Sequence, residues 1–219
     1  MTTPEDLLAR VEAAYAERDL PSWPDPHPDG GSPQVDEYSR YTDAPRYRIA
    51  HERGRAWARV LEDLGATVEP VEVDGARAGG LRITSPLPRT VPLLLLEHEH
   101  EHELDSARSV LPYLVVAVGH VDVLVDQQPY CGCDACDDGS ARLLGEIDEA
   151  VLPIVSGPSV VLRHPDWHAR WHTDGARVGR GSGSPGLHTT SRWCRELHAG
   201  GQPQLPEGTT AYVGSSWLR

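Results

Sequence analysis

The chain has 219 residues, a length typical of one domain, and it carries a net charge of −13 with arginine as its only strongly basic residue. This negative charge argues against nucleic acid and anionic membrane surfaces as partners. The N-terminal stretch MTTPEDLLARVEAAYAERD has neither the basic nor the apolar region of a signal peptide, and no apolar run approaches the roughly 20 residues of a membrane span. We therefore expect a cytoplasmic protein whose partner is another protein or a small molecule.

The N-terminal region predicts a helix over residues 4–18 and then an extended arm. Thr3 is a good N-cap, and Pro4 suits the first helical position. Residues 21–33, PSWPDPHPDGGSP, are rich in proline and glycine, which indicates a surface loop. Trp23 within this loop predicts at least one anchor to the rest of the protein.

The remaining chain predicts strands that lie mostly next to their sequence neighbours, flanked by helices, and this pattern favours an α+β fold with a largely antiparallel sheet. We expect a single domain with three parts: a helix and arm over residues 1–36, a core over 37–164, and a C-terminal extension over 165–219 that packs on the core. Helices are predicted over residues 43–65, 140–157 and 189–200, and strands over 67–73, 81–84, 91–96, 113–118, 121–126 and 159–164.

Two stretches of the core are similar to an uncharacterised actinobacterial family that is known only as a domain of unknown function. They are YSRYTDAPRYRIAH at residues 38–51 and YCGCDACDDGSARLLGEIDEAV at residues 130–151. The hallmark of that family is a CGCDACD box between a strand and a helix, and the resemblance covers about residues 38–157. It implies a shared fold and a cytoplasmic location, but no activity. Residues 97–110 look like an insertion relative to the family, and the tail beyond about residue 165 is hard to align with it.

The cysteine box could hold a metal ion. Cys133 and Cys136 have the two-residue spacing of a zinc knuckle, and Cys131 could supply a third thiolate. Zinc sites usually use four ligands, and a second CxxC pair is absent. Candidates for the fourth ligand are Cys194, His120 and His164.

Two other interpretations of the box remain open. Cys133 and Cys136 could form a reversible disulfide, because the following helix N-terminus lowers thiol pKa values, although Asp137 and Asp138 compete for the same helix dipole. Alternatively the box is a tight structural loop in which one of these aspartates caps the helix and the cysteines pack as small apolar groups.

A tract of alternating glutamate and histidine gives a second candidate site. His98, His100 and His102 would share one face of a strand, where imidazoles can chelate zinc, nickel or copper. We favour the alternative that this tract is the solvated, charged tip of a hairpin.

A third candidate lies near residues 164–172, where His164, His168 and His172 recur every four residues. Together with Arg170, the tryptophans Trp167 and Trp171 could line a ligand pocket. We favour a strand or hairpin whose tryptophans pack on the sheet.

Several catalytic signatures are missing from the sequence. A P-loop requires lysine, which this chain lacks, and there is no G-x-S-x-G or H-E-x-x-H motif. The sequence therefore favours a non-enzymatic binding or structural domain whose cysteine box is structural and could hold one zinc ion. The alternative is a metal- or thiol-dependent enzyme that uses the region rich in cysteine, aspartate and histidine.

Overall fold

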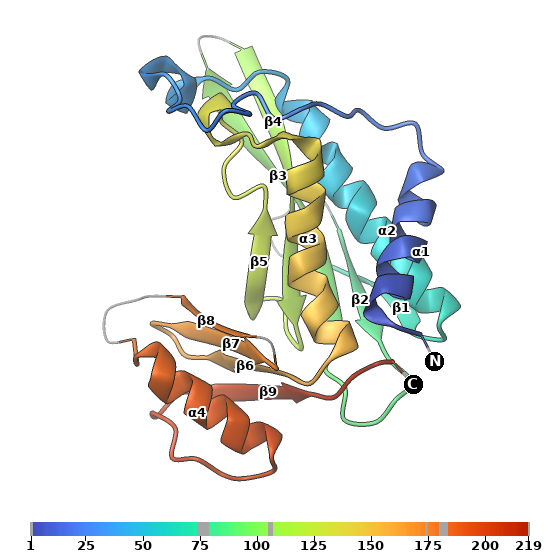
Figure 1. The fold of residues 1–219 in the computed structure, drawn as a ribbon, viewed down its shortest axis with the longest axis vertical. Helices are drawn as coiled ribbons and strands as arrows, with labels where there is room; N and C mark the ends of the chain where they lie inside the picture. The colour runs from blue at the N-terminus through green and yellow to red at the C-terminus, as the bar shows by residue number, and fades with distance from the viewer. Residues whose placement is uncertain (1, 74–78, 105–106, 174, 180–183, 219) are drawn as a thin grey trace.

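The computed structural model describes residues 2–73, 79–104, 107–173, 175–179 and 184–218, which form two antiparallel sheets with helices packed on them (Figure 1). The expected α+β class with antiparallel pairing is thereby confirmed. The predicted single sheet is replaced by two separate sheets.

The larger sheet is a five-stranded meander in which every strand pairs with its neighbours in sequence. Its centre is the long hairpin of β3 and β4, paired from Leu93 opposite Val118 to Leu104 opposite Ala107. The LLLL run of β3 is buried on both faces of the sheet, which explains its unbroken apolar character. The strands are β1 (Thr67–Val71), β2 (Gly80–Thr84), β3 (Leu93–Leu104), β4 (Ala107–Val118) and β5 (Leu124–Gln128).

Residues 97–110 form the outer half of this hairpin and continue both central strands, apart from 105–106, which lie outside the described residues. The predicted insertion is therefore not a separate element in the described part of the segment. Its alternating glutamate and histidine residues keep the two-residue period of a strand, so β3 simply extends beyond the apolar core. The prediction that this tract belongs to a hairpin is confirmed, whereas the tip at residues 105–106 lies outside the described residues.

Three helices cover one face of the larger sheet and share one core cluster with it (Figure 1). They are α1 (Pro4–Ala16), α2 (Ile49–Asp63) and α3 (Gly139–Ser156). Helix α1 begins with a capping box between Thr3 and Asp6. Helices α2 and α3 are joined by Asp148, which accepts hydrogen bonds from Arg53 at 2.6 and 3.0 Å and from the buried Trp57 indole at 2.7 Å.

The helix predicted over residues 43–65 is divided. A 3₁₀-helix, η2 (Ala44–Arg48), precedes α2, and a second one, η1 (Val35–Ser39), lies in the segment before it. Asp43 adopts a left-handed conformation with φ of 51°, which separates this segment from the arm. No helix within the described residues has the length and apolar character needed to cross a membrane.

The second sheet has four antiparallel strands in the order β8-β7-β6-β9, and α4 (Leu187–His198) covers one of its faces. Figure 1 shows this sheet and α4 at the end of the molecule opposite the arm. The sequence did not predict β9, because the tail has weak periodicity and pairs only with the distant β6. The strands are β6 (Ser159–Arg163), β7 (His168–His172), β8 (Gly175–Gly179) and β9 (Thr210–Gly214).

The two sheets share apolar packing. Val161 of β6 and Trp217 of the tail belong to the main core cluster, and the Trp217 amide donates to the Val155 carbonyl at 2.9 Å. Tyr212 of β9 packs so closely on Gly119 that a Cβ there would lie 2.5 Å from the tyrosine ring. A glycine with φ of 69° is therefore needed at this joint.

Candidate metal centre

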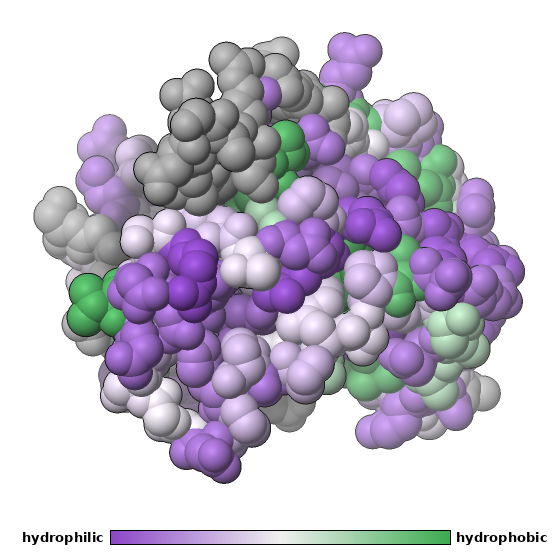
Figure 2. Space-filling model, turned by 90° about the horizontal axis from the view of Figure 1, so that it is seen from above, coloured by the Kyte–Doolittle hydropathy of each residue, from purple (hydrophilic) through white to green (hydrophobic). Residues whose placement is uncertain are grey.

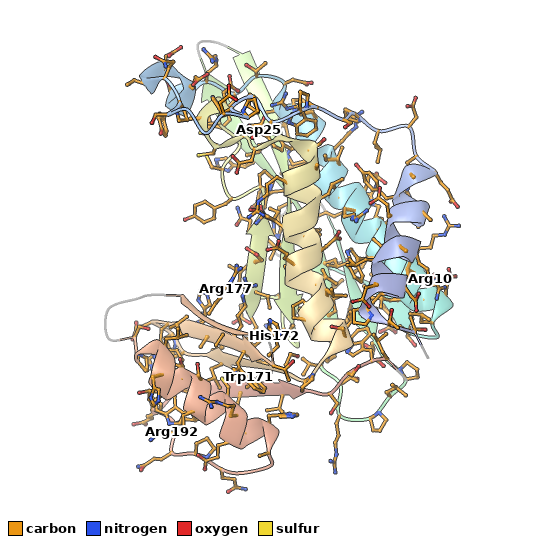
Figure 3. All side chains as sticks on the ribbon, viewed as in Figure 1. Arg10, Asp25, Trp171, His172, Arg177 and Arg192 are labelled. Carbon is orange, nitrogen blue, oxygen red and sulfur yellow. The ribbon has the colours of Figure 1, made fainter. Side chains whose placement is uncertain are left out.

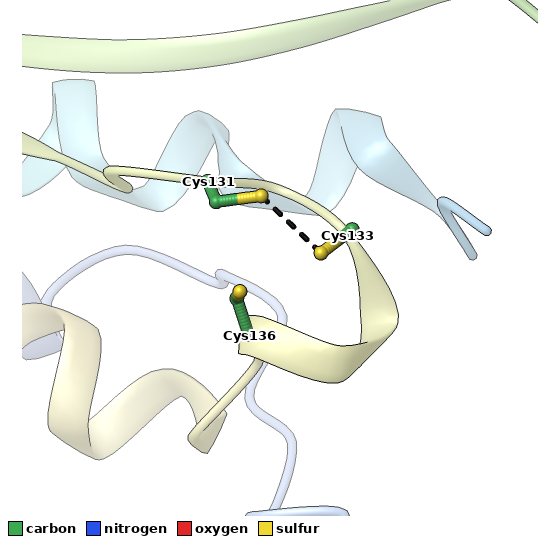
Figure 4. A group of neighbouring side chains, drawn as sticks. All are labelled: Cys131, Cys133 and Cys136. Atoms are coloured by element: carbon green, nitrogen blue, oxygen red, sulfur yellow. Dashed lines mark hydrogen bonds between the residues drawn. The ribbon is translucent and has the colours of Figure 1, made fainter. Parts of the chain in front are cut away.

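Three cysteines meet in the loop between β5 and α3 (Figure 4). The sulfur atoms of Cys131, Cys133 and Cys136 all lie within 4.8 Å of one another, and those of Cys131 and Cys133 are 3.2 Å apart. Cys133 is buried, Cys131 is partly buried and Cys136 is exposed. The group is therefore anchored on its inner side and open to solvent on the other; we call it the thiol group.

Asp134 ties the loop to the segment before η2. Its carboxylate accepts hydrogen bonds from the Thr42 amide at 2.7 Å, the Thr42 hydroxyl at 2.8 Å and Arg40 Nε at 2.6 Å. The Asp134 amide in turn donates to the Arg40 carbonyl at 2.8 Å. These bonds hold the short 3₁₀-helix η3 (Asp134–Cys136), which carries Cys136.

Asp137 ties the same loop to the N-terminal arm. Its buried carboxylate accepts two hydrogen bonds from the Trp23 indole, at 2.9 and 3.1 Å, and one from the Gly139 amide at 2.9 Å. It also forms an ion pair with Arg46, whose guanidinium lies 4.4 Å from the Trp23 ring centroid. The prediction that Trp23 anchors the arm is confirmed.

The start of α3 is completed by the arm. The Ser140 amide donates to the Trp23 carbonyl at 3.1 Å, and the Ser140 hydroxyl bonds to the same residue. Asp138, the N-cap by position, makes no capping hydrogen bond, so Asp137 is the aspartate that serves the helix start. Gly139 has φ of 83°, and a Cβ on it would lie 2.6 Å from the Asp25 amide nitrogen.

The three thiols differ in acidity. Burial raises the pKa of Cys131, but hydrogen bonds with the amide and thiol of Cys133 and with the Cys136 thiol outweigh burial and hold the pKa below its usual range. Burial and contacts with the other two thiols raise the pKa of Cys133 to about 12, and burial raises that of Cys136. Cys131 is therefore the thiol that ionises most readily, stabilised by its two neighbours.

A cavity of about 210 Å³ adjoins the thiol group, lined by Cys131 and Cys136 and also by Arg142 and Tyr47. The buried Tyr47 hydroxyl has no hydrogen-bond partner within the described chain. Figure 2 views the end of the molecule that carries the arm, and the coloured part of this face is mainly hydrophilic with hydrophobic residues in small, separate patches. The coloured part of this face therefore shows no broad apolar surface.

The structure does not bring Cys194 to the thiol group. Cys194 lies on α4, at the other end of the molecule from the loop between β5 and α3 (Figure 1). It is buried against Leu162, Trp167 and their neighbours, and this burial raises its pKa to about 12. His120 interacts with Asp122 at 2.5 Å and His164 stacks on Trp167, so neither histidine joins the thiol group.

The other histidine candidates are dispersed. His98 stacks on Tyr113, with ring centroids 5.1 Å apart, and His100 is exposed on the same strand. The side chain of His102 lies outside the described residues, so the three-imidazole hypothesis stays a prediction. In β7, Trp171 packs with the α4 side of the second sheet, as the favoured interpretation predicts.

The family of this chain follows from a comparison of the whole sequence with family models. The model of a family of unknown function (DUF6226) matches residues 11–219. The chain belongs to the DUF6226 family. No curated protein and no solved structure is significantly similar to the chain. The DUF6226 match extends well beyond residues 38–157, and its range includes the β3–β4 hairpin and the second sheet.

Sequence reasoning missed the residues that position the thiol group. Arg40, Thr42 and Arg46 hold Asp134 and Asp137 across about 90 residues of chain, as the separations of 91 to 94 positions show. The signal was present in part, because TDAPR and CDACDD both lie in the stretches quoted for the family resemblance. Nothing in either stretch indicates that the two contact each other.

Proposed function

We propose that this DUF6226 protein binds one zinc ion through Cys131, Cys133 and Cys136 and acts as a non-enzymatic binding domain, in the cytoplasm, for a protein or small-molecule partner. The observation that carries the proposal is the convergence of three sulfur atoms within 4.8 Å. In a reducing compartment such thiols stay available as metal ligands.

The spacing of the sulfur atoms supports this proposal. Zinc–sulfur bonds of about 2.3 Å in a tetrahedron place the sulfurs about 3.8 Å apart. The 3.2 Å separation of Cys131 and Cys133 and the 4.8 Å limit for the group bracket that value. Small side-chain rotations would complete the geometry, because Asp134 and Asp137 already hold the loop backbone.

The ligand chemistry narrows the choice of metal. Three thiolates form a soft donor set that suits zinc or monovalent copper better than magnesium or calcium. Asp134 and Asp137 are engaged by arginine, threonine and tryptophan donors, so they do not compete as ligands. Among the described residues, no histidine, aspartate, glutamate or further cysteine joins the group as a fourth ligand. The fourth coordination position is therefore left for water or a group on the partner.

A second candidate is a metal- or thiol-dependent enzyme. The observation that favours it is the 210 Å³ cavity lined by Cys131 and Cys136, because catalytic zinc keeps an open position beside a substrate site. Metal removal separates the two functions. A structural ion gives a large fall in the unfolding midpoint, whereas a purely catalytic ion leaves that midpoint nearly unchanged.

The decisive experiment is elemental analysis of untagged protein purified under reducing conditions. The proposal predicts one zinc ion per chain in the wild type and none in Cys133→Ser. Cys194→Ser is the matched control, because it also replaces a buried cysteine but should keep the metal. Wild-type protein that lacks metal and is not stabilised by added zinc would overturn the proposal, as would equal metal loss in both variants.

A further inference from the structure

A second cavity, also of about 210 Å³, lies between α3 and the strands β7 and β8 of the second sheet. Arg170 and His172 of β7 and Arg177 of β8 line one side, and Glu149 of α3 lines the other. Figure 3 shows Arg177 and His172 on the side of this sheet that faces α3, and Trp171 on the side toward α4. The polar residues therefore share the face that is free of α4.

The alternation of β7 explains this separation. Ala169 and Trp171 pack in the cluster beneath α4. Because side chains alternate along a strand, Arg170 and His172 point to the other face of the sheet. There Arg170 is directly opposite Arg177 in the β7–β8 register. Like charges in directly opposite positions repel each other, so this pair destabilises the sheet unless an anion neutralises it.

Carboxylates among the described residues neutralise only part of this charge. Arg170 donates to the Val125 carbonyl at 3.0 Å and lies 3.7 Å from an Asp126 oxygen, yet burial outweighs that carboxylate and lowers the Arg170 pKa. Arg177 forms no ion pair with a carboxylate in the described part of the chain. Exposed charge is common on edge strands, but here the charge lies beside a second, half-buried arginine on the same side of a cavity.

The acidic side of the cavity carries less charge than the basic side. Glu149 is exposed, and it lies 3.8 Å from Arg142, which already pairs with Glu146 at 2.9 Å. His168, on the same strand, adds no positive charge at neutral pH, because burial and the positive charges of nearby Arg163 and Arg170 lower its pKa. The guanidinium groups of Arg170 and Arg177 and the imidazole of His172 thus line this space, and Glu149 is the one carboxylate among its described lining residues.

We propose that this cavity binds the phosphate group of a small molecule between Arg170, Arg177 and His172. Guanidinium groups offer paired donors that match phosphate oxygens, and two such groups balance a doubly charged anion. The cavity volume suits a phosphate with a small substituent rather than a large cofactor. This site does not depend on the thiol group, which lies at the opposite end of α3.

The test is a calorimetric titration with inorganic phosphate at constant ionic strength. Loss of the charged hydrogen bonds in Arg177→Gln should weaken phosphate binding by about tenfold or more, whereas Glu149→Gln should strengthen it by removing a repulsive charge. Arg192→Gln is the matched control, because Arg192 is an exposed arginine on α4, away from the cavity (Figure 3).

Three results would overturn the proposal. They are no phosphate binding at millimolar concentration, equal weakening in Arg177→Gln and Arg192→Gln, and binding of succinate in preference to phosphate, which would indicate a carboxylate site. Since Arg177 is exposed, its replacement should leave the fold intact, and a circular dichroism spectrum identical to that of the wild type checks this.

Discussion

Asp134 and Asp137 hold the loop backbone in the conformation that brings the three cysteines of the thiol group together. Each carboxylate binds donors from a segment about 90 residues earlier or more, and each is flanked by a cysteine. Asp138 follows directly but is exposed and makes no capping bond. Two aspartates adjacent in sequence therefore differ in role, and this difference can be measured.

Replacing Asp137 with asparagine should destabilise the fold by about 3 kcal/mol, because the buried ion pair with Arg46 is broken and an uncompensated guanidinium remains. Asp138→Asn is the matched control and should change stability by less than about 0.5 kcal/mol. Urea denaturation measures both. Equal effects of the two variants would contradict the role assigned to Asp137.

Asp134 should make stability depend on pH in the acid range. Burial raises its pKa, but hydrogen bonds from Thr42 and Arg40 outweigh burial and lower it from 3.8. A lowered pKa in the folded state adds stability above the unfolded value, and this stability is lost as the pH falls through the folded value. Stability of Asp134→Asn should therefore fall less steeply with acid than that of the wild type, with Thr42→Val between them. Identical acid limbs in denaturant titrations would refute this.

At the scale of elements, the arm, η2 and the start of α3 form one unit around the thiol group. The Trp23 backbone caps α3 through hydrogen bonds with the amide and hydroxyl of Ser140. Gly139 allows the arm to cross directly over the helix start. The arm is thus held in place by its end near Trp23, even though residues 21–33 contain no helix or strand.

Gly139→Ala should displace the arm. A methyl group there would meet the Asp25 backbone at 2.6 Å in a left-handed conformation, and we expect a loss of about 2 kcal/mol or more. Hydrogen exchange of amides in residues 20–34 should accelerate. Gly145→Ala, in the middle of α3 with open space around it, is the control and should stabilise the helix by about 0.5–1 kcal/mol. An arm that stays equally protected in Gly139→Ala would contradict the model of a shared unit.

The elements themselves could be predicted well from local pattern. The helices α1, α3 and α4 and the hairpin strands follow from caps, apolar periodicity and alternation. The second sheet could not, because β9 pairs with β6 across about 50 residues and its own sequence lacks clear alternation. The same reason hid the anchors of the thiol group: the sequence places the three cysteines together, but only the fold places Arg40, Thr42 and Arg46 beside them.

At the scale of the whole molecule, both sheets belong to one core. Val161 and Trp217 connect the second sheet and the tail to the cluster under α1, α2 and α3. We therefore expect one cooperative unfolding transition, with coincident curves from circular dichroism and tryptophan fluorescence. Two separate transitions would show that the sheets fold independently.

The central claim is that three thiolates, and not Cys194, form a metal site. A titration with Co²⁺ under reducing conditions tests it directly, because sulfur-to-metal charge-transfer absorption reports thiolate ligands. We predict saturation at one Co²⁺ per chain, loss of the absorption in Cys133→Ser and full retention in Cys194→Ser. Absence of charge-transfer absorption in the wild type, or its persistence in Cys133→Ser, would contradict the claim.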